Sequence, residues 1–205
     1  MAIPWTNSIK HRGRLSIYTD PSVTGTWAVV FREALREFNA LSHRHRLGVT
    51  LTPSGASPTE SGGADVSVET ASGTVSRTYR GTEISESLDG TRMHGSTLQV
   101  SRADAIEKAF IFLPSHPQVN TPRGVRAVGT SVMKLIAVHE LVHACGLENS
   151  EHTTDDLFQA SPLVDPGSTP VGDRVRIEAG GRMRWMPPLV LSASTVENIR
   201  RLWAR

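Results

Sequence analysis

Residues 130–147 read TSVMKLIAVHELVHACGL, and this stretch decides how the rest of the chain must fold. It is apolar on almost every side of a helix, which is typical of a helix buried in the middle of a domain. Thr130 or Ser131 is available as the N-cap, and Gly146 as the residue at which the helix ends. Three ionisable side chains interrupt the apolar surface and are costly to bury without partners: His139, Glu140 and His143.

These three residues form the pattern HExxH. Positions four apart on a helix lie one turn above each other, so the imidazoles of His139 and His143 can reach one metal ion from the same face. Glu140 would project beside the metal, where its carboxylate can take a proton from a metal-activated water. Two neutral nitrogens and one further ligand leave an open position, which fits zinc best. We therefore expect Zn2+ as the cofactor.

Composition fits one globular domain of 205 residues. The 22 Lys and Arg alternate with 20 Asp and Glu along the chain, which argues against nucleic acid as the partner. The single cysteine, Cys145, cannot form an intramolecular disulfide. No window approaches the roughly 18 apolar residues of a membrane span, and the N-terminal residues lack the apolar core of a signal peptide. We expect a soluble protein without a membrane partner, either cytoplasmic or exported by a signal-independent route.

Hydrophobic periodicity predicts a mixture of strands and helices. Alternating or short apolar runs predict strands at residues 14–18, 49–52, 65–70, 96–100 and 109–113. Apolar residues three and four apart predict a long helix, here called helix A, over residues 27–41. Residues 72–91 are expected to form a loop or hairpin, and residues 153–185 a long irregular segment with at most a short strand at 174–178. A capping box, Ser194-Thr-Val-Glu197, predicts the start of a last helix.

The residues that follow His143 extend the pattern to HExxHxxG, ending at Gly146. The segment Ile136-Ala-Val-His-Glu-Leu-Val-His-Ala-Cys-Gly-Leu147 resembles the active-site helix of the metzincin clan of zinc peptidases, and within it the matrixins. The resemblance implies an α+β fold. It would be a single metzincin-like domain over residues 1–205, with a twisted mixed sheet of about five strands, helix A and an active-site helix in residues 1–147. Residues 148–205 would form a C-terminal subdomain with a long loop, a Met-turn and a final helix.

The third metal ligand departs from the family pattern. The family places it three residues after the glycine, where this chain has Asn149, a poor zinc ligand. The run His152-Thr-Thr-Asp-Asp156 resembles the matrixin sequence at its third ligand, displaced by three residues. By this resemblance His152 is the expected third ligand, and Asp155, Asp156 and Asn149 are the alternatives.

The family also has a methionine in a tight turn beneath the metal, followed by a C-terminal helix. The chain from Met186 to Trp203 resembles the matrixin tail, in which Met and Pro precede the start of the last helix. Met186 is therefore the expected Met-turn residue, with Met183 as the alternative.

Together these observations predict a zinc-dependent endopeptidase that hydrolyses protein or peptide substrates, with Glu140 as the general base. The resemblance implies that the strand near residues 97–100 forms the upper edge of the cleft and pairs with an extended substrate. Three alternatives remain: a gluzincin-like peptidase whose third ligand is Glu178 or Glu197, a catalytically silent zinc-stabilised module of a phage or secretion system, and a hydrolase of non-peptide amides. The substrate and the oligomeric state are not predicted.

Overall fold

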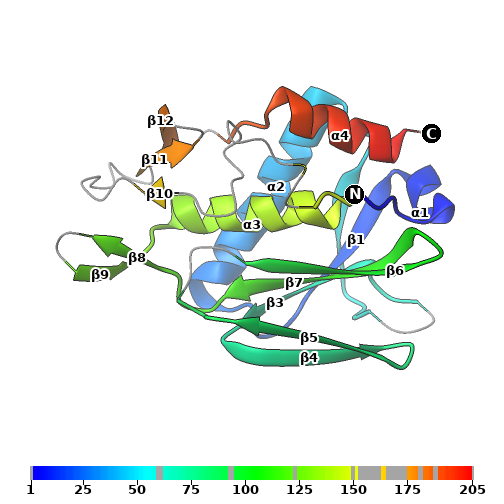
Figure 1. Cartoon of the computed structure of the whole chain (residues 1–205), viewed down its shortest axis with the longest axis horizontal. Coiled ribbons are helices and arrows are strands. Elements are labelled where there is room, and N and C mark those ends of the chain that lie inside the picture. Colours follow the sequence, from blue (N-terminus) through cyan, green and yellow to red (C-terminus); the bar gives the residue numbers. More distant parts are fainter. Residues whose placement is uncertain are drawn as a thin grey trace.

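The computed structural model describes residues 2–58, 62–91, 95–121, 124–148, 151, 163–164, 175–179, 182–186 and 189–204. Its main element is a five-stranded sheet in the order β2-β1-β3-β7-β6 (Figure 1). Four strands run parallel: β1 (Arg14–Thr19), β2 (Thr50–Ser54), β3 (Val66–Ala71) and β7 (Ala105–Pro114). The edge strand β6 (Ser96–Arg102) runs antiparallel to β7, with Thr97 opposite Ile111. The prediction of an α+β fold with a mixed five-stranded sheet is therefore confirmed.

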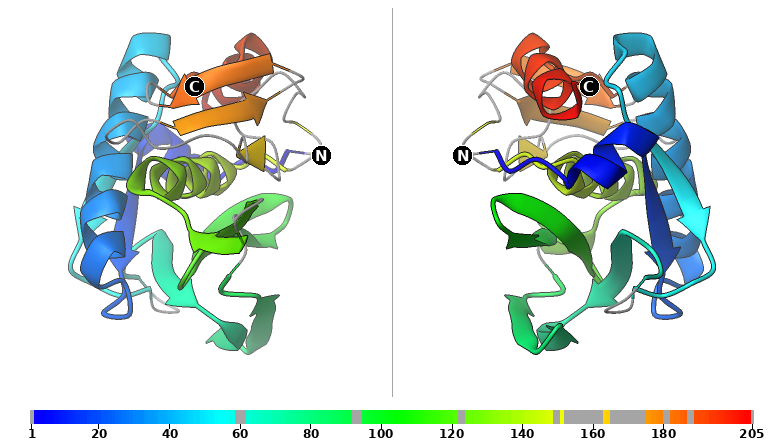
Figure 2. Two further views of the ribbon diagram at one scale, coloured as in Figure 1. Left: turned by 90° about the vertical axis from the view of Figure 1, so that its left-hand side faces the viewer. Right: turned by 90° about the vertical axis from the view of Figure 1, so that its right-hand side faces the viewer.

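Two long helices pack on this sheet. Helix α2 (Gly25–His45) contains the expected helix A, and α3 (Thr130–Ala144) contains the HExxH pattern. Two shorter helices are α1 (Asn7–Arg12), which the periodicity did not predict, and α4 (Ala193–Trp203). In two perpendicular views α3 lies between the sheet on one side and α4 on the other (Figures 1 and 2). This central position explains why α3 is apolar on nearly every side.

Alternate residues of β7 face two separate cores. Ala109, Ile111 and Leu113 belong to the large core shared with α2 and α3. Phe110 and Phe112 belong to a smaller core, which is closed by a hairpin of β4 (Gly73–Tyr79) and β5 (Thr82–Leu88). Both faces of the strand are buried, as expected for a strand that reads as a continuous apolar run. The hairpin within residues 72–91 is confirmed.

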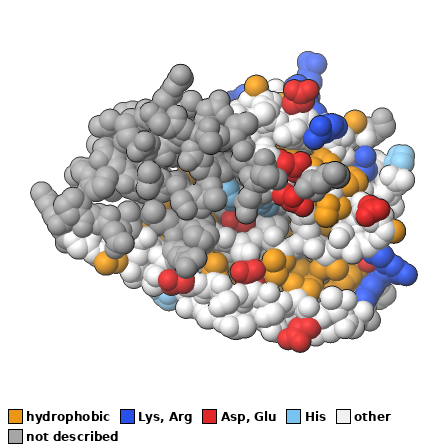
Figure 3. All heavy atoms as spheres, viewed as in Figure 1, with side chains coloured by type: hydrophobic (Ala, Val, Ile, Leu, Met, Phe, Trp, Pro, Cys, Tyr) orange, Lys and Arg blue, Asp and Glu red, His pale blue; other side chains and the backbone are white. Residues whose placement is uncertain are grey.

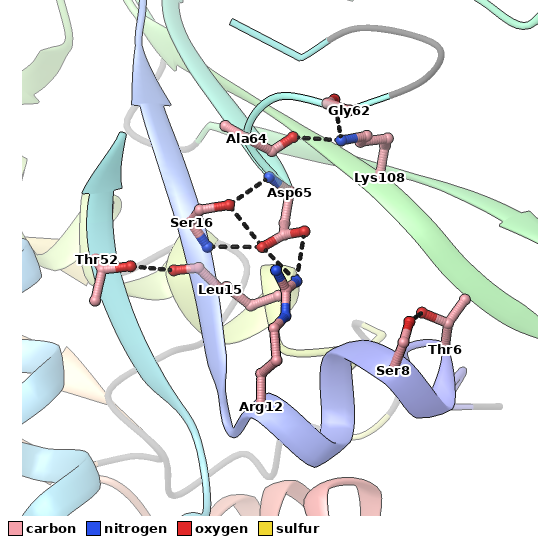
Figure 4. A network of polar contacts seen from close by, with 10 residues as sticks. All are labelled: Thr6, Ser8, Arg12, Leu15, Ser16, Thr52, Gly62, Ala64, Asp65 and Lys108. Atoms are coloured by element: carbon pink, nitrogen blue, oxygen red, sulfur yellow. Dashed lines mark hydrogen bonds and ion pairs between the residues drawn. The ribbon is translucent and has the colours of Figure 1, made fainter. Parts of the chain in front are cut away.

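Buried polar groups tie the start of the sheet together (Figure 4). The carboxylate of Asp65 accepts hydrogen bonds from Arg12 Nη2 at 2.9 Å, from the backbone N–H of Ser16 at 2.8 Å and from Ser16 Oγ at 2.7 Å. Lys108 Nζ donates to the carbonyl oxygen of Ala64 at 2.6 Å. These bonds join the end of α1 to β1, to the segment before β3 and to β7.

Several local predictions were wrong. The N-cap of α3 is Gly129, so Thr130 and Ser131 already lie in the helix. The N-cap of α4 is Ser192, whose side chain accepts a hydrogen bond from Thr195 N at 3.1 Å, and Ser194 is the second residue of the helix. In both cases more than one small or hydroxyl residue precedes the apolar repeat, and the periodicity does not decide which of them caps the helix.

The segment expected to be irregular contains more strand than predicted. Strands β10 (Leu163–Val164), β11 (Val175–Ala179) and β12 (Arg182–Met186) form an antiparallel three-stranded sheet. Only β11 corresponds to the short strand expected at 174–178. A further hairpin, of β8 (Gln118–Thr121) and β9 (Gly124–Ala127), was not predicted. Over the described residues, no helix has both the length and the apolar character needed to cross a membrane.

Candidate active site

The two histidines of the HExxH pattern meet through their Nε2 atoms. His139 Nε2 and His143 Nε2 lie 2.9 Å apart, with the ring planes at 68° to each other. Both residues are buried, with 7% and 8% of their surfaces exposed. One turn of α3 separates them, so the predicted convergence of the two rings on one point is confirmed.

The second nitrogen of His143 fixes the orientation of its ring. His143 Nδ1 lies 2.8 Å from the carbonyl oxygen of Leu147, which can only accept a hydrogen bond. Nδ1 must therefore carry the proton, and in the neutral ring the lone pair is on Nε2, directed at His139. This is the tautomer that a metal-ligating imidazole requires, with a carbonyl as its outer partner.

The carboxyl group of Glu140 is held by the edge strand. Thr97 Oγ1 donates to Glu140 Oε2 at 2.6 Å and lies 3.2 Å from the backbone oxygen of Glu140. Gly95 contributes a backbone hydrogen bond to the same carboxyl group. A Cβ atom added to Gly95 would lie 2.8 Å from Glu140 Cγ and 2.7 Å from the carbonyl oxygen of Phe112. The bare backbone of Gly95 is therefore what makes room for Glu140.

Burial sets the protonation behaviour of Glu140, which is 2% exposed. Burial raises the pKa of its carboxyl group from 4.5 to about 7, against the hydrogen bonds from Thr97 and Gly95, which lower it. The negative charge of Glu86, on β5, adds to the rise in the pKa. A carboxyl group with a pKa near 7 can both accept and release a proton close to neutral pH.

The exit of α3 is held by side chains from both ends of the chain. The indole N–H of Trp5 donates to the carbonyl oxygen of Ala144 at 2.8 Å. The indole N–H of Trp203 donates to the carbonyl oxygen of Cys145 at 3.0 Å. Gln99 Nε2, on β6, donates to the carbonyl oxygen of His143 at 2.8 Å. The two tryptophans supply donors to carbonyl groups that the end of a helix leaves without intrahelical partners, and the His143 carbonyl also accepts from Gly146 N at 2.9 Å.

Helix α3 ends just before Gly146, as the sequence predicted. Gly146 has φ +109°, and a Cβ atom there would lie 2.5 Å from the carbonyl oxygen of Ile3. A side chain at this position is therefore disfavoured by the positive φ angle and would collide with the backbone of Ile3.

The donor set fits zinc. Two Zn–N bonds of about 2.0–2.1 Å can reach both Nε2 atoms from one point, because these atoms are 2.9 Å apart. Among the residues that the structure describes, His139 and His143 are not joined by a third His, Cys, Asp or Glu in a group that could hold an ion. The expected third ligand, His152, and its alternatives Asn149, Asp155 and Asp156 all lie outside the described residues.

The remaining candidates have different positions. Glu197 is exposed on α4, and Glu178 lies on β11, where only the backbone is described. Met183 and Met186 both belong to β12, opposite Glu178 and Val175. The residues directly after Met186 are outside the described part, so the Met-turn stays a prediction.

Histidine and acidic side chains come together near the middle of the face on which α3 and β6 lie side by side (Figures 1 and 3). The expected cleft strand, residues 97–100, belongs to β6 at the edge of the sheet. Within the described part of the chain, β6 pairs only with β7.

Sequence reasoning missed the residues that hold this site. Thr97 and Gly95 lie far from Glu140 in the sequence, and a short polar strand gives no sign of what it contacts. The two tryptophans are typical core residues by pattern, and only the fold brings their N–H groups to α3. The one available signal was the cost of burying Glu140, which requires donors to be somewhere nearby.

A scan against protein-family models finds no match for this chain, and a search of the curated proteins finds no relative. The function must therefore be argued from the site.

Proposed function

We propose that this protein is a zinc-dependent endopeptidase of the metzincin clan, similar to the matrixins. The observation that carries the proposal is the pair of Nε2 atoms 2.9 Å apart on two buried histidines, on the same helix as the buried Glu140. His139, His143 and a third ligand, proposed to be His152, would hold the ion. When bound, zinc supplies a Lewis acid that polarises a carbonyl group and lowers the pKa of a water molecule to about 7.

Glu140 has the environment of a general base and acid. Thr97 holds its Oε2 atom, which limits the positions that the carboxyl group can take. We infer that Glu140 takes a proton from the attacking water and delivers it to the leaving amine. The carboxyl group must be ionised for the first step and protonated for the second, and in the metal-free chain its pKa of about 7 allows both forms near neutral pH.

The edge of β6 supports a peptide as the substrate. An extended peptide can add to an exposed sheet edge through its main-chain hydrogen bonds. Thr97 and Gln99 lie on this strand and contact Glu140 and His143, so a peptide along β6 would pass beside the candidate base. This arrangement favours cleavage within a chain over hydrolysis of a small amide.

The test compares wild-type protein with Glu140→Gln, each loaded with zinc. Wild type is expected to bind one zinc per chain and to digest casein, with activity lost in a chelator. Glu140→Gln is expected to keep its zinc and its fold and to lose about 10²-fold or more of its activity, as general base catalysis typically contributes 10²–10⁴-fold. Undiminished activity of Glu140→Gln would refute the role of Glu140, and zinc binding without cleavage by wild type would favour the silent module.

A further inference from the structure

A second carboxyl group, that of Glu151, lies in the segment that leaves the active-site helix. Its Oε1 atom accepts a hydrogen bond from the backbone N–H of Ala2 at 2.9 Å, and its Oε2 atom accepts one from Glu148 N at 3.0 Å. Its own backbone N–H donates to the carbonyl oxygen of Glu148 at 3.0 Å. One half-buried side chain thus joins two parts of the chain that are far apart in sequence.

Residues 2–6, here called the N-terminal strap, are themselves fixed on both sides. On one side, Ile106 N donates to Pro4 O at 2.8 Å and Thr6 N donates to Ile106 O at 3.2 Å, which attaches the strap to β7. On the other side, Ile3 N donates to Gly146 O at 3.2 Å. The N-terminus accordingly lies beside the C-terminal end of α3 (Figure 1).

The strap therefore provides a rigid support to which the exit of α3 is attached at three points. Trp5 binds Ala144, Ile3 binds Gly146, and Ala2 binds Glu151. The first two contacts hold the end of the helix itself. The contact with Glu151 is the one that extends the support beyond the helix, into the segment that carries the candidate third ligands.

We propose that Glu151 is a positioning residue for the metal site: its carboxyl group anchors the chain between His143 and the third ligand to the N-terminal strap. The inference rests on the proposed function. Both oxygen atoms of Glu151 accept hydrogen bonds from backbone N–H groups, so the carboxyl group is engaged in holding the chain, and it acts on the metal through the path of the backbone.

The energetic reason is preorganisation. A ligand delivered by a chain segment must be ordered when the ion binds, and ordering it costs conformational entropy. Where the segment is already anchored, this cost has been met during folding, and the ion binds more tightly. Loss of an outer partner of a metal site typically lowers metal affinity about 10–100-fold.

The experiment measures zinc affinity by competition with a chromophoric chelator for wild type, Glu151→Ala, Glu151→Gln and His152→Ala. Glu83→Gln is the matched control, because Glu83 is an exposed carboxylate on β5. Glu151→Ala is expected to bind zinc about tenfold or more weakly. Glu151→Gln keeps one acceptor oxygen and should lose less, and Glu83→Gln should bind as wild type does.

Two further readouts separate positioning from a general loss of structure. The melting temperature of each metal-free variant should change little compared with its zinc affinity. The visible spectrum of the Co2+-substituted protein should lose the intensity of a four-coordinate site in Glu151→Ala and regain part of it in Glu151→Gln.

The outcomes distinguish this inference from the proposed function. Wild-type zinc affinity in Glu151→Ala, together with weakened binding in His152→Ala, would overturn the role of Glu151 and leave the zinc site in place. Weakened binding in Glu151→Ala with wild-type affinity in His152→Ala would also overturn it, since His152 would then not be the ligand that Glu151 positions. A wild-type protein that binds no zinc would refute the proposed function itself.

Discussion

Replacing Gly95 with alanine tests whether the edge strand sets the position of Glu140. A Cβ atom at residue 95 would lie 2.8 Å from Glu140 Cγ, 3.1 Å from Glu140 Cδ and 2.7 Å from the carbonyl oxygen of Phe112, whereas ordinary contact begins at 3.4 Å. The Phe112 carbonyl belongs to β7 and is fixed within the sheet, with Phe112 opposite Ser96. The backbone at residue 95 must therefore move away from this carbonyl oxygen. The Glu140 side chain must give way as well, by about 0.6 Å if the new methyl group keeps its ideal position.

The expected loss follows from this displacement. A misplacement of about 1 Å in an active site can lower activity about 10²-fold, so a shift of about 0.6 Å predicts a loss of roughly tenfold in kcat/KM. The added methyl group should also destabilise the protein by about 1–3 kcal/mol, the usual cost of overpacking. Zinc content should be unchanged, because neither histidine contacts the new methyl group among the nearest atoms.

The assay is hydrolysis of a fluorogenic peptide under conditions in which the protein is fully folded, with zinc content measured in parallel. Gly55→Ala is the matched control, because a Cβ atom at Gly55 meets nothing within 4 Å and the backbone there is not left-handed. It should retain wild-type activity and stability. Wild-type kcat/KM in Gly95→Ala would refute the argument that the bare backbone at residue 95 positions the carboxyl group.

Three further predictions concern stability. Asp65→Asn should lower the free energy of unfolding in urea by about 2 kcal/mol, since it removes the charge of a buried carboxylate that is paired with the exposed Arg12; an unchanged midpoint would contradict this. Trp203→Phe should cost at least about 1–3 kcal/mol, because it leaves the buried carbonyl oxygen of Cys145 without its indole donor, and a loss of less than this in thermal or urea unfolding would count against that contact. In metal-free wild type the pKa of Glu140 is about 7 in the folded chain and near 4.5 when unfolded, so stability that is present below pH 4.5 is lost as the pH rises through 7. The stability of Glu140→Gln relative to wild type should therefore rise by about 3 kcal/mol from pH 4.5 to pH 8. Stability curves that stay parallel over this range would show that burial does not raise the pKa of Glu140.

The main sheet and the long helices could be predicted because local periodicity and burial agree there. The apolar repeat of α2 faces the core with Trp27, Phe31, Phe38 and their neighbours. In β3 the apolar residues Val66 and Val68, two apart in sequence, both belong to the large core. HExxH could be interpreted for the same reason, since the spacing of its histidines depends only on helix geometry. Nothing distant in the sequence is needed to bring the two imidazoles together.

The contacts that hold the site could not be predicted, because each of them joins residues far apart in the chain. Trp5 and Ala144, Thr97 and Glu140, and Ala2 and Glu151 meet only in the folded protein. Their residue types are common in unrelated roles. Strands β10 and β12, and with them the antiparallel sheet, were missed for a related reason: they are short and lie among polar and glycine-containing stretches that give no clear alternation.

The physical character of the site follows from where α3 lies. A helix surrounded on nearly all sides can be apolar throughout, but here it brings three ionisable groups into the interior. The protein meets part of their cost: Thr97 and Gly95 bind the carboxyl group, and Leu147 binds one imidazole. The raised pKa of Glu140 shows that this compensation is incomplete.

Incomplete compensation is informative because the surrounding structure is otherwise well satisfied. The carbonyl groups at the end of α3 each receive a donor, two of them from tryptophan side chains. The fold thus supplies donors to the backbone at the end of this helix but leaves the Glu140 carboxylate destabilised in its charged form. The unfavourable energy is therefore localised at Glu140. A bound cation would relieve that energy by its charge. The same residues that reduce the stability of the metal-free chain would then provide the proposed affinity for zinc.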